Sequence, residues 1–224
     1  MDEKLPPIDL WDKYVPIISV DAGDGSFHTT VHIVDAIGEP RLYTELLSLL
    51  ENAKEEDTIM FNLNTPGGRL DTTTMLIDAL DTTLATTIGK ITGEVASAGT
   101  MIAMAMDDLQ TTPFGSMMIH NYSSGLFGKG NELKSRMDFE TPHLAFIFHS
   151  VYKNFLSKKE RLKVISGDDK YMAATEIDLR WAKVQGKRQK AFDKMNVEAE
   201  KANTEALLDH LANQGYTITK EVDS

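Results

Sequence analysis

A serine flanked by small residues is the first candidate for chemistry in this sequence. Ser97 lies in the segment Gly93-Glu94-Val95-Ala96-Ser97-Ala98-Gly99, between a strand-like run and a helix-like run. A sharp turn at this point would expose the serine hydroxyl, and the free N–H groups of the following helix could stabilise a developing oxyanion. The strict G-x-S-x-G pattern of a nucleophile elbow is absent, and Ala-Ser-Ala is also common at close helix contacts. The segment is therefore a nucleophile candidate that needs a base.

A second segment, Asn64-Thr65-Pro66-Gly67-Gly68-Arg69, also joins a strand-like run to a helix-like run. Two consecutive glycines permit backbone conformations that other residues avoid, and they let a substrate approach bare backbone N–H groups. Taken alone, a Pro-Gly-Gly turn is more often structural than functional.

His120 is the best candidate for the base. It ends the short apolar run Met117-Met118-Ile119-His120, beside a glycine-rich loop at residues 123–130. The other five histidines lie within strand-like or helical runs or near the end of the chain. A single histidine of this kind usually has a structural role, but a strand end beside a loop is where a serine could reach an imidazole.

Strand-like and helix-like runs alternate around these segments from Val31 onward, which predicts βα units and an α/β fold. The first ~30 residues are expected to be irregular. The expected elements are strands at residues 31–37, 58–63, 87–92 and 117–120, and helices at 42–53, 73–83 and 98–106.

The second half of the chain is expected to be mainly helical. Residues 132–158 carry much apolar bulk, and Pro142 should kink this helix or divide it in two. Residues 187–213 are predicted to form a charged helix. The apolar bulk, which includes Phe139, Phe146, Phe148 and Phe155, favours a subunit contact. The alternative is that the last helix folds back over it within a monomer.

The composition excludes several classes of function. The 224 residues include 34 acidic and 23 basic side chains, and this net charge of −11 argues against a non-specific nucleic-acid binder. The absence of cysteine removes disulfides, thiolate metal sites and cysteine nucleophiles. Residues 1–16 lack the order of a secretory signal, and no apolar run is long enough to span a bilayer. We expect a cytoplasmic protein without metal, cofactor or membrane contact.

Four segments, taken in order, carry a resemblance to a known family. Two are the glycine pair and the Ser97 segment, which resemble the patterns N-S-P-G-G and G-x-A-A-S-M-G. The third is Met118-Ile119-His120, like M-I-H, and the fourth is Asp169-Lys170-Tyr171-Met172-Ala173-Ala174-Thr175-Glu176, like D-R-F-L-S-A-P-E. The patterns are those of ClpP, the proteolytic subunits of ATP-dependent Clp proteases. The resemblance runs from about Val31 to Val184, with closely matching separations.

This resemblance implies a crotonase-like α/β fold, a spiral of βα units with a protruding helical handle. It implies a serine endopeptidase in which Ser97 is the nucleophile, His120 the general base and Asp169, rather than Asp168, the group that orients the imidazole. The oxyanion hole would be formed by backbone N–H groups of Gly68 and Ala98. The residues expected to bind a polypeptide substrate, as an added strand, are Gly67, Ser123, Ser124, Gly125 and Leu126.

The resemblance also implies regions and partners. We expect a divergent segment at residues 1–30, which in the family forms axial loops, a protease domain at 31–186 and a helical extension at 187–224. Family members form homo-oligomeric heptameric rings stacked in pairs, which can work with an ATP-dependent unfoldase. Pro142 departs from the family in the handle helix, and Trp181 and Val184 replace a glycine and an aspartate. Such departures suit a phage or otherwise specialised relative.

Other functions are weighed against this one. A Ser–Lys peptidase would need a lysine base, and the nearest, Lys90, is expected along the preceding strand. An acyl-CoA hydratase of the crotonase type would need acid and base carboxylates, and only Glu94 lies nearby. A head-maturation-type phage protease and a catalytically silent structural or assembly protein remain as alternatives.

Overall fold

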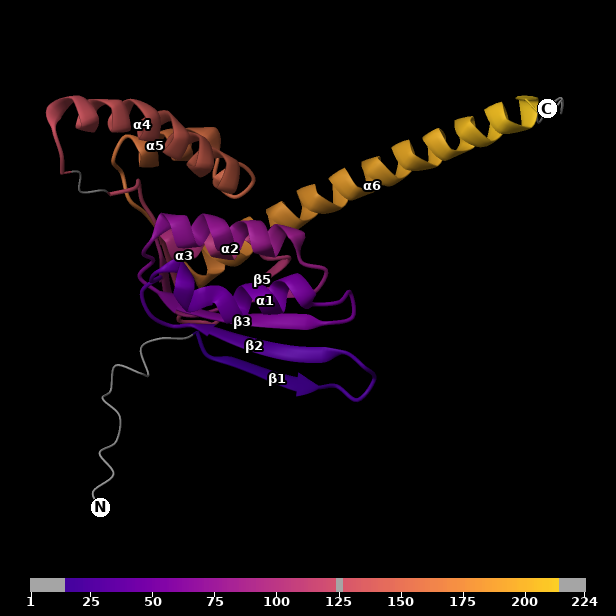
Figure 1. Ribbon diagram of the computed structural model, residues 1–224, viewed down its shortest axis with the longest axis horizontal. Coiled ribbons are helices and arrows are strands. Elements are labelled where there is room, and N and C mark those ends of the chain that lie inside the picture. Colours follow the sequence, from indigo (N-terminus) through magenta and orange to yellow (C-terminus); the bar gives the residue numbers. More distant parts are fainter. Residues whose placement is uncertain (1–14, 124–126, 214–224) are drawn as a thin grey trace, which may run out of the picture. The chain divides into compact units, whose positions relative to one another are not determined.

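The computed structural model describes residues 15–123 and 127–213, and within these ranges seven strands form one sheet (Figure 1). The spatial order is β1-β2-β3-β4-β6-β7, with β5 also paired to β4. The strands β2 to β6 run parallel to their neighbours, whereas β1 and β7 are antiparallel edge strands. Their bounds are β1 Ile17–Asp21, β2 Phe27–Ile33, β3 Thr58–Thr65, β4 Thr86–Ala96, β5 Asp108–Thr111, β6 Ser116–Ile119 and β7 Lys170–Ala173.

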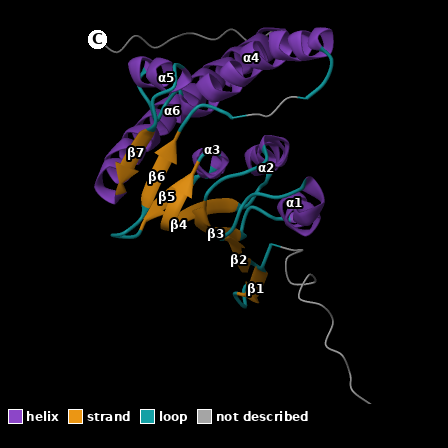
Figure 2. Cartoon of the chain, turned by 90° about the vertical axis from the view of Figure 1, so that its left-hand side faces the viewer, coloured by secondary structure: helices purple, strands orange, loops and turns teal. Residues whose placement is uncertain are grey.

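Helices follow the parallel strands in turn, so the chain is built from successive βα units, as the sequence predicts. Helices α1, α2 and α3 lie along one face of the sheet (Figure 2). The bounds are α1 Thr44–Asn52, preceded by the 3-10 helix η2 Pro40–Tyr43, α2 Leu70–Thr82, α3 Ala98–Ala105, α4 Gly130–Tyr152, α5 Lys158–Ile165 and α6 Ala174–Asn213.

The core lies between the sheet and these helices. Alternate residues of β3, namely Ile59, Phe61 and Leu63, are almost completely buried, as expected for strands with one face on a core. Helix α3 is buried all round because its residues are small or apolar on every side. A register shift between β3 and β4, at Leu63 and Thr65, comes just before β4 ends at Ala96. The candidate serine therefore comes directly after two buried strand residues, Val95 and Ala96.

The N-terminal prediction is wrong in one respect. Residues 17–33 form the β1–β2 hairpin rather than irregular chain, and β2 ends at Ile33 instead of residue 37. The carboxylates of Asp21 and Asp24 accept backbone hydrogen bonds within the connecting turn, at 2.8 and 3.0 Å. Residue Ile37 instead forms an isolated parallel bridge with Gly68. The short strands β5 and β7 were also not predicted.

The helical predictions need two corrections. Helix α4 is one uninterrupted helix with Pro142 inside it, and the chain breaks between Tyr152 and Lys158 instead. No residue from 130 to 147 is buried, so water can bond the carbonyl that the proline leaves without an intrahelical partner. Helix α6 begins at Ala174, 13 residues before the predicted start at 187. The helix starts early because it begins directly after β7, and β7 was not predicted.

The chain divides into two compact units, residues 1–181 and 182–224. The first contains the sheet and helices α1 to α5. The second, as far as it is described, is the continuation of α6 to Asn213. None of the helices in the described ranges combines the length and apolar character that crossing a membrane requires.

Candidate active site

Ser97 has an unusual backbone conformation. It sits between the end of β4 and the start of α3 with φ 51° and ψ −125°, and no other described residue except glycine has a positive φ. Such a conformation costs about 1–3 kcal/mol and persists only where the surroundings impose it. Ser97 is the N-cap residue of α3, yet its side chain makes no capping hydrogen bond. The turn therefore has the geometry of a nucleophile elbow, although the sequence pattern is not the usual one.

The glycine pair lies directly against this turn. Gly67 has φ +92°, and a Cβ atom built on it would come within 2.7 Å of both the Ala96 carbonyl oxygen and the Ser97 Cβ. A Cβ atom on Gly68 would collide with the backbone of Ile37. The sequence needs glycine at both positions because two stretches of backbone meet here without room for side chains.

The backbone N–H groups of this turn have a defined direction. The Ile37 N–H donates to the Gly67 carbonyl at 2.8 Å, and the Arg69 N–H donates to the Ile37 carbonyl at 2.9 Å. Successive N–H groups on extended chain point to opposite sides, so the N–H of Gly68 points away from this bridge. Ala98 is the first residue of α3, where N–H groups lack intrahelical acceptors. Gly68 and Ala98 therefore remain the predicted backbone donors beside Ser97.

Strand pairing brings His120 to the end of the sheet where Ser97 lies. Ala96 pairs with Met118 across β4 and β6, and the Ser97 N–H donates to the Met118 carbonyl at 2.8 Å. His120 follows two residues later, just past the end of β6. Since Met117 and Ile119 are buried, Met118 and His120 project from the other face of the strand. His120 itself is half-buried.

Asp169 comes directly before β7, and His120 comes directly after its partner strand β6. The antiparallel register of β6 and β7 pairs Met118 with Tyr171 and Ile119 with Lys170. Continued by one residue, it sets Asp169 across from His120, and directly opposed residues have Cβ atoms about 5 Å apart. The three candidate residues therefore come from three neighbouring strand ends.

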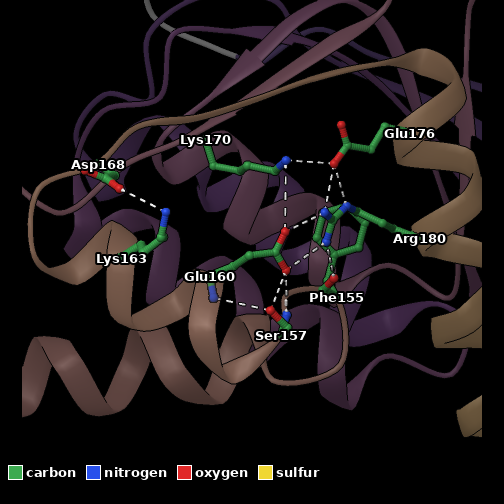
Figure 3. A network of polar contacts seen from close by, with 8 residues as sticks. All are labelled: Phe155, Ser157, Glu160, Lys163, Asp168, Lys170, Glu176 and Arg180. Atoms are coloured by element: carbon green, nitrogen blue, oxygen red, sulfur yellow. Dashed lines mark hydrogen bonds and ion pairs between the residues drawn. The ribbon is translucent and has the colours of Figure 1, made fainter.

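The neighbouring Asp168 is engaged elsewhere. Its backbone N–H donates to the Lys163 carbonyl at 3.1 Å, and its carboxylate lies 4.0 Å from the Lys163 Nζ (Figure 3). Both contacts direct Asp168 toward the end of α5. This arrangement agrees with the register that prefers Asp169.

A network of charged side chains holds β7, the strand that begins directly after Asp169 (Figure 3). The Lys170 Nζ lies 2.8 Å from Glu176, and Arg180 spans Glu176 and Glu160 at 2.8 and 2.6 Å. The Glu160 carboxylate also accepts from the N–H and hydroxyl of Ser157, which caps α5. The hydrogen bond from Arg180 is the main cause that lowers the pKa of Glu160 to about 2. The network ties β7 to α5 and to the first turns of α6.

Sequence reasoning missed several residues that hold the site. Arg180 is one, and Asn121 is another: its amide donates to the Ile165 carbonyl at 2.9 Å, which anchors the chain just after His120. Thr100 and Tyr152 form a buried contact beneath Ser97, with oxygens 2.6 Å apart. A signal for Thr100 existed, because a hydroxyl inside the otherwise apolar segment 98–105 needs a specific partner.

The other predicted residues have mixed outcomes. Ser123 is exposed, whereas Ser124, Gly125 and Leu126 lie outside the described residues. Lys90 lies within β4, seven residues before Ser97, which is roughly 20 Å along an extended strand. The Glu94 side chain is exposed at the register shift. Within the described ranges, His, Asp and Glu side chains form no group of three or more that could hold a metal ion.

Comparison with known proteins identifies a family. The sequence profile described as Clp protease matches residues 29–178, a span that holds the glycine pair, Ser97, His120 and Asp169. Curated proteins give no match. The matched span covers the sheet and its helices as far as the start of α6, and the mixed α/β architecture agrees with a ClpP-type fold. By this match and this fold, the chain belongs to the Clp protease family, a family of peptidases.

Proposed function

We propose that this protein is a serine endopeptidase that hydrolyses peptides or unfolded polypeptides through Ser97, His120 and Asp169. The observation that carries the proposal is the left-handed conformation of Ser97 at a strand-to-helix turn. A fold has no need of this strain at a serine, and strained residues of this kind cluster at active sites. The family match adds the reaction class.

In this mechanism Ser97 Oγ attacks the carbonyl carbon of the scissile peptide bond while His120 accepts the hydroxyl proton. The N–H groups of Gly68 and Ala98 stabilise the oxyanion of the tetrahedral intermediate. His120 then donates its proton to the leaving amine, which departs and leaves an acyl ester on Ser97. Water, deprotonated by His120, attacks the ester and releases the second product. Asp169 keeps the imidazole in the tautomer that accepts from the serine.

Substrate binding is proposed to rely on backbone contacts. An extended peptide would pair as an added strand between Gly67 and the loop that begins at Ser123. Pairing through the backbone recognises extended chain and selects little among side chains. The substrates are therefore extended or unfolded segments rather than folded proteins.

A homo-oligomeric ring that encloses Ser97 is proposed because such broad specificity needs restricted access. Support comes from α4, where Met137, Phe139 and Phe146 have exposed fractions of 55, 67 and 68%. Of the four phenylalanines predicted as contact residues, Phe148 and Phe155 are buried within the subunit instead. Three large apolar side chains left on one exposed helix are typical of a subunit contact. Heptameric rings in stacked pairs and an ATP-dependent unfoldase remain part of this proposal, as does a cytoplasmic location.

Hydrolysis of short fluorogenic peptides and of casein tests the activity. The parent should show turnover, and Ser97→Ala should lower kcat by about 10⁴-fold or more while the urea midpoint stays unchanged. Ser166→Ala, on the surface at the end of α5, is the matched control and should leave turnover unchanged. Equal turnover in Ser97→Ala and the parent would overturn the nucleophile assignment.

Native mass spectrometry tests the ring separately. A species of many subunits is expected, and Phe139→Glu with Phe146→Glu should dissociate it. A parent that stays at 24.9 kDa at micromolar concentration would refute the enclosed chamber while leaving the chemistry standing.

A further inference from the structure

The strained turn at Ser97 is held by hydrogen bonds at both of its peptide groups. Its N–H donates to the Met118 carbonyl, and its own carbonyl accepts twice from Thr100, from the N–H at 3.0 Å and from the hydroxyl at 2.7 Å. The first of these bonds belongs to the sheet. Of the second pair, the N–H bond is open to any residue except proline, but the hydroxyl bond depends on the side chain of residue 100, which therefore affects how firmly the Ser97 carbonyl is oriented.

The Thr100 hydroxyl has a second partner deep in the protein. It lies 2.6 Å from the hydroxyl of Tyr152, the last residue of α4, and both side chains are almost completely buried. A threonine hydroxyl carries a single hydrogen, and the Ser97 carbonyl can only accept. Thr100 must therefore donate to Ser97, and Tyr152 must donate to Thr100. Burial raises the pKa of Tyr152, so the phenol keeps the proton that this order requires.

The chain of donors thus runs from Tyr152 through Thr100 to the Ser97 carbonyl. Hydrogen bonds in such a chain strengthen one another, and a short bond in a dry interior holds its geometry firmly. The tyrosine ring is itself fixed, because it packs against Phe148 with ring centroids 4.7 Å apart. Helix α4 is anchored to the protein near this point, since Phe148 and Tyr152 are its buried residues.

We propose that Thr100 and Tyr152 are positioning residues for the Ser97 nucleophile, acting through the Ser97 carbonyl to hold its left-handed backbone. This inference rests on the proposed function of Ser97. A purely structural reading explains the Thr100 bond as ordinary bonding of a helical threonine to the preceding turn. The buried Tyr152 hydroxyl needs a partner for stability alone, but its partner here is the same hydroxyl that bonds the Ser97 carbonyl, so the contact also bears on the turn. The two hydrogen bonds from Tyr152 through Thr100 to the Ser97 carbonyl, which we call the relay, also join the end of α4 to the candidate nucleophile.

The test uses four variants of the full chain, with kcat and KM measured for peptide hydrolysis. Thr100→Ser keeps the hydroxyl and should retain kcat within about twofold. Tyr152→Phe removes one hydrogen bond and should lower kcat about fivefold. Thr100→Val removes the relay and should lower kcat about 100-fold with KM nearly unchanged, as expected when a nucleophile is misplaced. Thr83→Val, whose hydroxyl bonds the Leu50 carbonyl at 2.8 Å far from the turn, is the control.

The double variant Thr100→Val with Tyr152→Phe separates positioning from stability. In Thr100→Val the Tyr152 hydroxyl is buried without an acceptor, which is destabilising, and removing that hydroxyl should restore part of the urea midpoint. The kcat should stay as low as in Thr100→Val. A kcat that recovers along with stability would overturn the proposal, because activity would then simply follow folding.

A crystal structure of Thr100→Val tests the relay without any turnover. The proposal expects Ser97 to leave the positive-φ region. A Ser97 still at φ near 50° would overturn the relay, even if the enzyme is active. If the parent shows no turnover but Ser97 moves in this variant, the relay stands and the proposed function fails.

Discussion

Replacing Arg180 by glutamine should lower the free energy of unfolding, and the loss should be largest near neutral pH. The Arg180 guanidinium is the hub of the charged network, because it contacts Glu160, Glu176 and the Phe155 carbonyl. Its side chain is 19% exposed and that of Glu160 is 27% exposed, so water screens these contacts only partly. Glutamine keeps some of the packing and removes the charge. The variant therefore isolates the ionic part of the network.

The magnitude follows from the pKa of Glu160. Arg180, together with two hydrogen bonds from Ser157, lowers this pKa from the ordinary value of 4.5 to about 2, and the whole shift corresponds to about 3 kcal/mol of stability. Ser157 supplies part of this figure and water screens another part, so the contribution of Arg180 is about 2 kcal/mol. A lowered carboxyl pKa stabilises the folded state above pH 4.5, and the contribution is lost as the pH falls toward 2. The difference between parent and variant should therefore be about 2 kcal/mol at pH 7 and shrink below pH 4.

Urea unfolding at pH 7, 5 and 3, at one fixed protein concentration, measures this difference. Lys134→Gln is the control, since it breaks an ion pair with Asp138 whose side chains are 79 and 66% exposed. The control should cost at most about 0.5 kcal/mol at any pH. A loss for Arg180→Gln that is no larger than the control, or that is the same at pH 3 and pH 7, would refute the reasoning.

Three further predictions concern single positions. Gly67→Ala should lower kcat at least tenfold and destabilise by about 2 kcal/mol, because its Cβ would press on the Ala96 carbonyl and Ser97; an active variant of parental stability would contradict this packing. Asp169→Asn should lower kcat by about 10⁴-fold, whereas Asp168→Asn should lower it by less than threefold. The reverse order in the same assay would mean that Asp168, not Asp169, faces His120. Trp181→Phe should lower the free energy of unfolding by about 1–2 kcal/mol, since the buried indole N–H donates to Asp108 at 3.1 Å, and an unchanged urea midpoint would count against it.

The sequence allowed the interior of the fold to be predicted well and its edges poorly. The strand at 58–63 and the helices at 42–53 and 98–106 lie close to the observed β3, α1 and α3, because β3 and α1 have a regular apolar pattern and α3 is a continuous run of small and apolar residues. Strands β5 and β7 have four residues each and, unlike the equally short β6, contain no run of large aliphatic residues, so only their pairing with a neighbour defines them. The β1–β2 hairpin did carry a signal, since its turn at residues 21–26 lies between two runs of β-branched residues.

The candidate site could also be predicted only in part. The Ser97, His120 and Gly67–Gly68 segments stand out as motifs, so they could be selected from sequence. Their meeting point could not, because it depends on the β4–β6 pairing and on a glycine that touches the Ser97 turn. The supporting residues were missed for a related reason. Tyr152 lies far from Ser97 along the chain and only the fold joins it to Thr100, just as only the fold joins Arg180 to Glu160.

The central claim is that Ser97 is a nucleophile, and labelling with a fluorophosphonate probe tests it most directly. The probe forms a covalent bond only with an activated serine, and mass spectrometry of the digested protein identifies the residue. The account predicts one adduct per chain, at Ser97, with no adduct in Ser97→Ala and a strongly reduced rate in His120→Ala. An unlabelled parent, or an adduct on another serine that persists in Ser97→Ala, would contradict it.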